Sequence, residues 1–266
     1  MAIVGKNGLD SCEDAVVVTA THAAVIDGAT DLTGATYSGR TGGQIAARAV
    51  ADAVRSWPGD IGWAEAVADA TQATAQAIAD AGKPDRKPTW LAPRAVAAIY
   101  SAHWRQVWSI GDCEVRIGAD VHTRPLPGSD TLGQFRRLWL ASERVAGVSD
   151  DELRAGTDPG LLAAGPLLER IGRFANTVGN PYAYGVFDGS RVPGDCVAVL
   201  DVPVGAEVVL ATDGHIDVTG DLAHAEHVLA AAVRADPLAL HDRRLSRATP
   251  VGATGFDDRS WIRLTA

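Results

Sequence analysis

The chain has 266 residues, of which 47% are hydrophobic and 21% are charged, and its formal net charge is -9. A chain of this length and composition is expected to fold around a sizeable core, which excludes the disordered and fibrous classes. The acidic balance and the lack of clustered lysine and arginine argue against a nucleic-acid partner, because phosphate backbones are bound by basic surfaces.

The cysteines and the apolar stretches of the sequence indicate the cellular compartment. The three cysteines, Cys12, Cys113 and Cys196, are far apart and have no CxxC spacing, so neither a disulfide framework nor a zinc site is expected. The first residues contain no apolar region typical of a signal peptide, and no later stretch has the length of a membrane span. We therefore expect a cytoplasmic protein without a membrane segment, whose oligomeric state the sequence leaves open.

The predicted elements follow one another without a linker or an internal repeat. Strands are expected where apolar, often β-branched runs lie between Gly, Asp or Pro, namely at 15–20, 23–28, 95–102, 105–112, 114–120, 196–202, 207–214 and 260–266. Helices are expected where apolar residues recur with helical spacing, namely at 42–57, 62–82 and 221–236. A further region, 131–174, is dominated by Leu, Ala, Arg and Glu, which is typical of two or three helices.

Short connections join several of these strands, as between 95 and 119. Such connections favour antiparallel pairing over parallel βαβ units. We therefore expect one α+β domain over residues 1–266, in which helix pairs cover the sheet faces and a helical insertion lies at about 131–174.

Acidic residues stand at the ends of predicted strands, in the pairs Glu13-Asp14, Asp27-Gly28, Gly111-Asp112, Asp213-Gly214 and Asp257-Asp258. Taken singly, an Asp-Gly pair is typical of an ordinary turn in which Asp caps its own backbone. Taken together, acids at several strand ends can converge, and Mg²⁺ and Mn²⁺ prefer oxygen ligands of this kind. Two such ions about 4 Å apart can orient a hydroxide for attack on a phosphoester.

Six segments follow one another between about 7 and 264, namely CEDAVVV, AVIDGAT, TGGQIAARAV, WSIGDCEVRIG, VVLATDGHID and GFDDRSWIRL. As an ordered set they resemble the successive motifs of the metal-dependent protein phosphatases of type 2C, the PPM-like family, in its bacterial branch. The resemblance implies a four-layer α-β-β-α sandwich, in which two antiparallel sheets are flanked by helix pairs. It also implies two Mn²⁺ or Mg²⁺ ions at one edge, with a third ion in bacterial members.

The resemblance also assigns metal ligands residue by residue. Asp27 would bridge two metal ions, with the carbonyl of Gly28 as a further ligand. Asp14 would bind one of these metals. Asp213 and Asp257 would complete the shell of the second metal.

Three further positions have expected roles beside these ligands. Asp112, together with Asp213, matches the place of a third, weaker metal in bacterial members, and Glu13 would hydrogen-bond a metal water. His215 stands two residues beyond Asp213, where a group that titrates near neutrality could donate a proton to the leaving group. A packing or solvent-facing histidine is the more common interpretation of such a position.

The match fails at the expected phosphate-binding arginine. Leu9 stands where the family has that arginine, four positions before Glu13. A bidentate arginine fixes a phosphate better than a lysine does, so Lys6 is a partial replacement and Arg40 is a second candidate. An inserted loop, 29–41, separates the Asp-Gly pair from the following glycine pair. This loop is expected either to contact and recognise the substrate or to be a disordered loop on the surface.

These features together predict a metal-dependent phosphatase that hydrolyses phosphomonoesters by attack of a metal-bridging hydroxide. By resemblance, the expected substrate is phosphoserine or phosphothreonine in a protein. A small phosphorylated metabolite is the alternative, because the arginine is missing and the loop is enlarged. A catalytically weak regulatory homologue is the third possibility, but the retained acids argue against it, since buried unpaired acids are destabilising.

Overall fold

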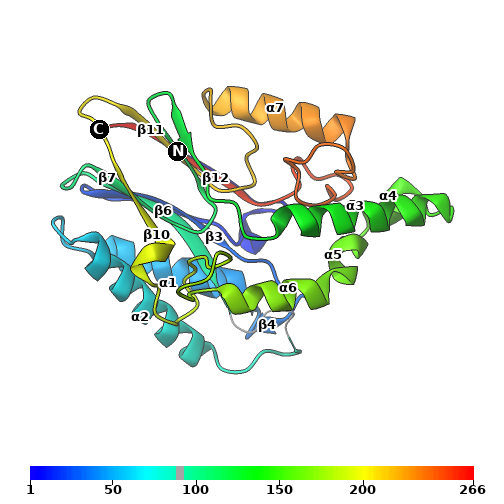
Figure 1. Ribbon diagram of the computed structural model, residues 1–266, viewed down its shortest axis with the longest axis horizontal. Helices are drawn as coiled ribbons and strands as arrows, with labels where there is room; N and C mark the ends of the chain where they lie inside the picture. The colour runs from blue at the N-terminus through cyan, green and yellow to red at the C-terminus, as the bar shows by residue number, and fades with distance from the viewer. Residues whose placement is uncertain (88–92) are drawn as a thin grey trace.

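Two five-stranded antiparallel sheets lie face to face in the computed structural model, which describes residues 1–87 and 93–266 (Figure 1). The first sheet contains, in spatial order, β10 (Val197–Asp201), β7 (Gln106–Ile110), β6 (Ala95–Ser101), β3 (His22–Gly28) and β2 (Ala15–Val18). The second sheet contains β1 (Ala2–Val4), β12 (Arg259–Thr265), β11 (Glu207–Ala211), β8 (Glu114–Ile117) and β9 (Asp120–His122).

Small and β-branched side chains fill the space between the two sheets. Val25 and Ala98 from the first sheet share one buried cluster with Leu210 from the second. The alternate residues of β3, Ala24 and Ile26, belong instead to the cluster that faces the helices. Because successive side chains of a strand point to opposite faces, an almost wholly apolar strand such as β3 can serve both layers.

Helices α1 (Gly42–Ser56) and α2 (Trp63–Ala81) cover the outer face of the first sheet (Figure 1). Thr41 begins α1 with a capping box, in which its side chain accepts from the backbone of Gln44 and the Gln44 side chain accepts from the backbone of Thr41. Gly82 ends α2 with φ +73°, a conformation that favours glycine. Val50 and Val54 lie on the buried face of α1.

Helix α7 (Leu222–Ala235) covers the outer face of the second sheet, where its Ala225 packs with Val209 and Trp261. The layers are therefore helix, sheet, sheet and helix, and the predicted α-β-β-α sandwich is confirmed. The two outer layers differ, because the segment after α7 is irregular in the described residues. Pro237 and Pro250 lie in this segment and disfavour a second long helix there, because proline has no backbone N–H to donate within a helix.

Further helices lie between β9 and β10, namely α3 (Ser129–Val145), α4 (Asp150–Leu153), α5 (Pro159–Ala163) and α6 (Gly165–Ile171). Figure 1 shows this group beyond one end of the strands. Short 3-10 turns occur at Leu9–Ser11, Gly172–Phe174 and Gly194–Cys196. Within 1–87 and 93–266, no helix combines the length and the apolar character that a membrane crossing needs.

Candidate active site

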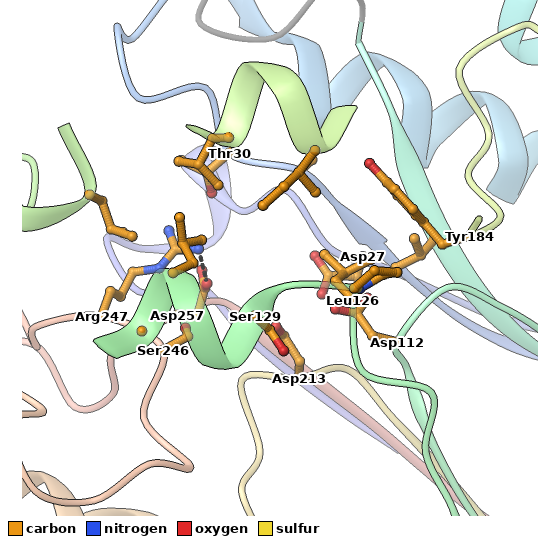
Figure 2. A pocket seen from close by; sticks show the side chains of 18 of the residues that line it. Asp27, Thr30, Asp112, Leu126, Ser129, Tyr184, Asp213, Ser246, Arg247 and Asp257 are labelled. Carbon is orange, nitrogen blue, oxygen red and sulfur yellow. Dashed lines mark ion pairs between the residues drawn. The ribbon is translucent and has the colours of Figure 1, made fainter. Parts of the chain in front are cut away.

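Acidic side chains from several strand ends meet at one cavity of about 300 Å³ (Figure 2). Its lining includes Asp27 in β3, Asp112 after β7, Asp213 after β11 and Asp257 before β12. Strands β3 and β7 both pair antiparallel with β6, so they run parallel to each other and end at the same edge. In the second sheet, β11 ends beside the start of its neighbour β12.

Glycine is required where the backbone passes close to these acids. A Cβ atom added to Gly28 would lie 2.5 Å from the carbonyl oxygen of Gly43. A Cβ atom added to Gly214 would lie 2.0 Å from the carbonyl oxygen of Asp258. Both distances are shorter than real Cβ contacts, so the two Asp-Gly pairs combine a carboxylate with a close approach of two backbone segments.

The acids of the cavity raise one another's pKa values. Burial raises the pKa of Asp27 well above its ordinary value, and the charges of Asp213 and Asp14 raise it further. Burial and then the charge of Asp213 raise the pKa of Asp112 to about 7. Carboxylates that repel one another in this way favour the binding of a cation.

Asp257 is paired with two cations of the chain itself. Its Oδ1 accepts a hydrogen bond from Lys6 Nζ at 2.7 Å, and its Oδ2 lies 2.8 Å from Nη2 of Arg247. Burial opposes the ionisation of Asp257, but Arg247 and Lys6 outweigh it and lower the pKa of this carboxyl. Figure 2 shows the Asp257–Arg247 ion pair apart from Asp27 and Asp112. The predicted role of Asp257 as a metal ligand would require these contacts to loosen.

Lys6 lies among several oxygen atoms. Its Nζ donates to Oγ1 of Thr30 at 2.9 Å and lies 3.6 Å from Oε2 of Glu13 and 3.6 Å from Oδ2 of Asp258. Burial alone would lower the pKa of Lys6, but Asp257, Glu13 and Asp258 raise it above its ordinary value. The ammonium group is therefore a fixed positive charge beside the cavity.

Glu13 and Asp14 lie behind the cavity lining. The two carboxylate oxygens of Glu13 accept from the hydroxyls of Thr41 and Thr30, each at 2.6 Å. Oδ2 of Asp14 accepts from Thr212 at 2.7 Å and from Ser260 at 2.8 Å. Both acids are almost fully buried, so these hydroxyls supply the hydrogen bonds that water would otherwise make.

The donor set suits a hard divalent ion, although it does not form a ready-made three-residue site. Within 1–87 and 93–266, no three His, Cys, Asp or Glu side chains are arranged so that together they could hold a metal ion. Mg²⁺ usually takes one or two carboxylates and keeps several waters. Asp27 and Asp213 are a pair of this kind, since both line the cavity and the charge of Asp213 raises the pKa of Asp27.

Two predicted site residues neither line the cavity nor form a hydrogen bond or ion pair with its acids in the described part of the chain. Arg40 is an exposed residue of the short hairpin formed by β4 (Thr36–Tyr37) and β5 (Arg40–Thr41). His215 is buried and meets Trp261 edge-on, with the ring centroids 5.2 Å apart. Burial lowers the pKa of His215 to about 4. The structure thus brings neither side chain to the acids.

The inserted loop contributes to the cavity. Thr30 and Leu32 line it, and Leu32, Ala35 and Tyr37 are buried. Of the two interpretations of this loop, the structure favours the one in which it forms part of the site. Its buried residues had no periodic pattern that would have identified them in the sequence.

Sequence reasoning missed several cavity residues, most of them outside the six motifs. The most informative is Arg247, which lies in the irregular segment between α7 and β12. Nothing in the local sequence distinguishes Arg247 from its neighbours Arg243 and Arg244. The other missed lining residues that matter below are Arg137, Arg243, Leu132, Leu161, Leu168 and Ile171.

Comparisons with known proteins find similar solved structures but no similar sequence family. No model of a protein family matches this sequence, and no curated protein sequence matches it. A serine/threonine phosphatase of Mycobacterium tuberculosis, PstP/Ppp, has 15% identity and a TM-score of 0.49, with 98% of this chain and 95% of that chain covered. The phosphatase MsPP of Mycobacterium smegmatis has 14% identity and a TM-score of 0.49, with 98% and 95% covered.

A more distant structure is PppA, described as a regulatory component of the type VI secretion system in Pseudomonas aeruginosa. It has 17% identity and a TM-score of 0.42, with 96% of this chain and 91% of that chain covered. All three TM-scores are below 0.5, so the chemistry of this site has to be judged from its own residues.

Proposed function

We propose that this protein is a metal-dependent hydrolase of phosphomonoesters. The observation that supports it is that Asp27, Asp112 and Asp213 line the same cavity as Arg247, with Lys6 beside them. Hydrolysis of a phosphate ester needs a cation that activates water and positive groups that hold the phosphate. The acids can attract the cation, and the side chains of Arg247 and Lys6 supply the positive groups that hold the phosphate.

The residues proposed to hold a divalent ion are Asp27 and Asp213, with the carbonyl of Gly28 as a further oxygen donor. Asp112 and Asp213 form a second pair of carboxylates on the same cavity. When bound, Mn²⁺ or Mg²⁺ would lower the pKa of a water molecule and offset the charge of the phosphate. The mutual repulsion of the acids supports this proposal, because a bound cation removes it.

Arg247 is proposed to take the place of the arginine that is missing at Leu9. Its Nη2 is held by Asp257 at 2.8 Å. Its buried Nε has no hydrogen-bond partner in the part of the chain that the structure describes. The Nε itself is enclosed by protein atoms, but the Arg247 side chain is 24% exposed and lines the cavity, so the exposed part of the guanidinium can donate to a phosphate oxygen.

The proposed reaction consumes one water molecule. Water attacks phosphorus, the bond between phosphorus and the ester oxygen breaks, and the proton lost by water balances the one gained by the leaving alcohol. Phosphorylated protein side chains and small phosphate esters are both monoesters that this chemistry can hydrolyse.

The test is the hydrolysis of p-nitrophenyl phosphate with Mn²⁺, compared with EDTA and with Asp27→Asn. We expect turnover that EDTA abolishes, and a fall in kcat of at least about 100-fold in Asp27→Asn, because the proposed ligand loses its charge. Asp120→Asn on the exposed end of β9 is the control and should keep wild-type activity. Calorimetric titration should show that Asp27→Asn binds Mn²⁺ more weakly than the wild type, whereas Asp120→Asn binds it as the wild type does. No metal-dependent turnover and no Mn²⁺ binding by the wild type would disprove the proposal.

A further inference from the structure

The cavity has two chemically different walls. The acids lie at the strand ends, and residues of α3, α5 and α6 line the same cavity (Figure 2). A ligand that reaches Asp27 therefore also has to fit against these helices. The volume of about 300 Å³ is at the lower end of the range of about 300–1,000 Å³ for small-molecule pockets.

The helical wall is apolar. Leu132 from α3, Leu161 from α5 and Leu168 from α6 form one cluster with Leu32 from the inserted loop. Ile171 at the end of α6 lines the cavity beside them. An apolar surface that faces a catalytic cavity is stabilised when an apolar ligand group covers it, because water then leaves both surfaces.

Two arginines add positive charge to the same cavity. Arg137 of α3 and Arg243 both line it. Neither forms an ion pair or a side-chain hydrogen bond within residues 1–87 and 93–266, whereas Arg136, next to Arg137, is paired with Asp158. Unpaired arginines at a pocket attract an anionic ligand and offset the repulsion from the acids.

We propose that the substrate is a small phosphate monoester with a compact apolar body, aromatic or branched aliphatic. This inference rests on the proposed phosphatase activity and deepens it. The phosphate lies toward Arg247 and Asp27, and the apolar body lies against the leucine wall, defined as Leu32, Leu132, Leu161 and Leu168. A phosphorylated side chain on the surface of a folded protein would have to enter between the strand ends and the helices.

The experiment compares kcat/KM, with Mn²⁺, for benzyl phosphate, glycerol 1-phosphate and a phosphothreonine peptide. The first two esters both release an alkoxide-type leaving group, so the comparison isolates the apolar body. We expect benzyl phosphate to exceed both other substrates by at least about tenfold, since one well-placed apolar group in a pocket discriminates by that much or more.

Matched variants test the leucine wall directly. Leu161 is 8% exposed and lines the cavity, whereas its neighbour Leu162 is 47% exposed and lies outside the lining. Leu161→Gln should bring the ratio of benzyl phosphate to glycerol 1-phosphate close to one, and Leu162→Gln should leave the ratio unchanged. Leu132→Gln, at a partly buried wall position, gives a second test if Leu161→Gln does not fold.

The outcomes separate this inference from the proposed function. Efficient hydrolysis of the phosphopeptide, together with a substrate ratio that neither wall variant changes, would overturn the substrate class and leave the phosphatase activity standing. If no ester is hydrolysed, the proposed function fails, and binding of benzylphosphonate then tests the wall separately. Wild-type binding that Leu161→Gln or Leu132→Gln weakens at least about tenfold would support the apolar pocket, and equal or absent binding would overturn it.

Discussion

Lys6 is the residue whose position gives the site its sharpest test. It lies 2.7 Å from Asp257 and donates to Thr30, so it connects the N-terminal segment, the inserted loop and the start of β12. The sequence offered it only as a partial substitute for a missing arginine. The structure places it beside Arg247, and the two cations share one carboxylate.

Lys6→Met should lower kcat/KM for p-nitrophenyl phosphate by roughly 10- to 100-fold. The variant removes a charge-assisted hydrogen bond of about 1.5–3 kcal/mol and leaves Asp257 with Arg247 as its remaining cationic partner. Steady-state kinetics at saturating Mn²⁺ measure the effect. Lys83→Met, at an exposed lysine, is the matched control. Unchanged kcat/KM in Lys6→Met would show that this ammonium group has no part in catalysis or phosphate binding.

At the scale of elements, the irregular segment after α7 has to be held in place for Arg247 to face the acids. Buried Arg136 of α3 donates to Asp158 at 2.7 Å and to the carbonyl of Leu238 at 2.7 Å. Oδ2 of Asp158 also accepts from the backbone N–H of Ala248 at 2.9 Å. The helical insertion is thus tied to the residue that follows Arg247.

Asp158→Asn should lower the free energy of unfolding by about 3 kcal/mol, because it leaves the guanidinium of Arg136 buried without its carboxylate. Asn remains a good N-cap for α5, so the change keeps the cap and removes the two contacts of Oδ2, to Arg136 and to the backbone of Ala248. Urea unfolding measures the loss, and KM for p-nitrophenyl phosphate should rise as Ala248 and Arg247 lose their anchor. Asp150→Asn, at a half-exposed pair with Arg144, should change stability by less than about 1 kcal/mol. Equal losses in both variants would contradict the proposed anchor.

The elements also show how far sequence reasoning reached. The strands and helices with long apolar patterns, such as β3, β6, α1 and α7, lie where their periodicity predicted them. The short strands β1, β4, β5 and β9 were missed, because two or three residues carry no measurable period. The convergence of Asp27, Asp112 and Asp213 was predictable from their shared position at strand ends. The positions of Arg247 and of the leucine wall could not be predicted. They depend on how irregular segments and helices pack in three dimensions, and no local sequence pattern reports that packing.

At the scale of the whole molecule, the acidic cavity couples stability to pH and to metal. In the metal-free protein the pKa of Asp112 is raised to about 7, by burial and by Asp213, whereas the pKa of Asp in an unfolded chain is about 3.9. Between these two values the folded state binds more protons than the unfolded state. The free energy of unfolding contributed by this group therefore falls as pH rises from about 4 to about 7.

Asp112→Asn should remove this contribution. In EDTA, the Tm of the variant should exceed that of the wild type by a smaller margin at pH 5 than at pH 8, because the wild type loses the contribution of Asp112 over this range and at pH 8 its Asp112 carboxylate is ionised and is repelled by Asp213. Added Mn²⁺ at pH 8 should raise the Tm of the wild type more than that of the variant, because a bound cation offsets the repulsion and gains a ligand. Thermal scans over pH 5–8, with and without Mn²⁺, measure both differences. A variant whose Tm differs from wild type by the same amount at every pH would show that Asp112 does not share the electrostatic coupling of the cavity.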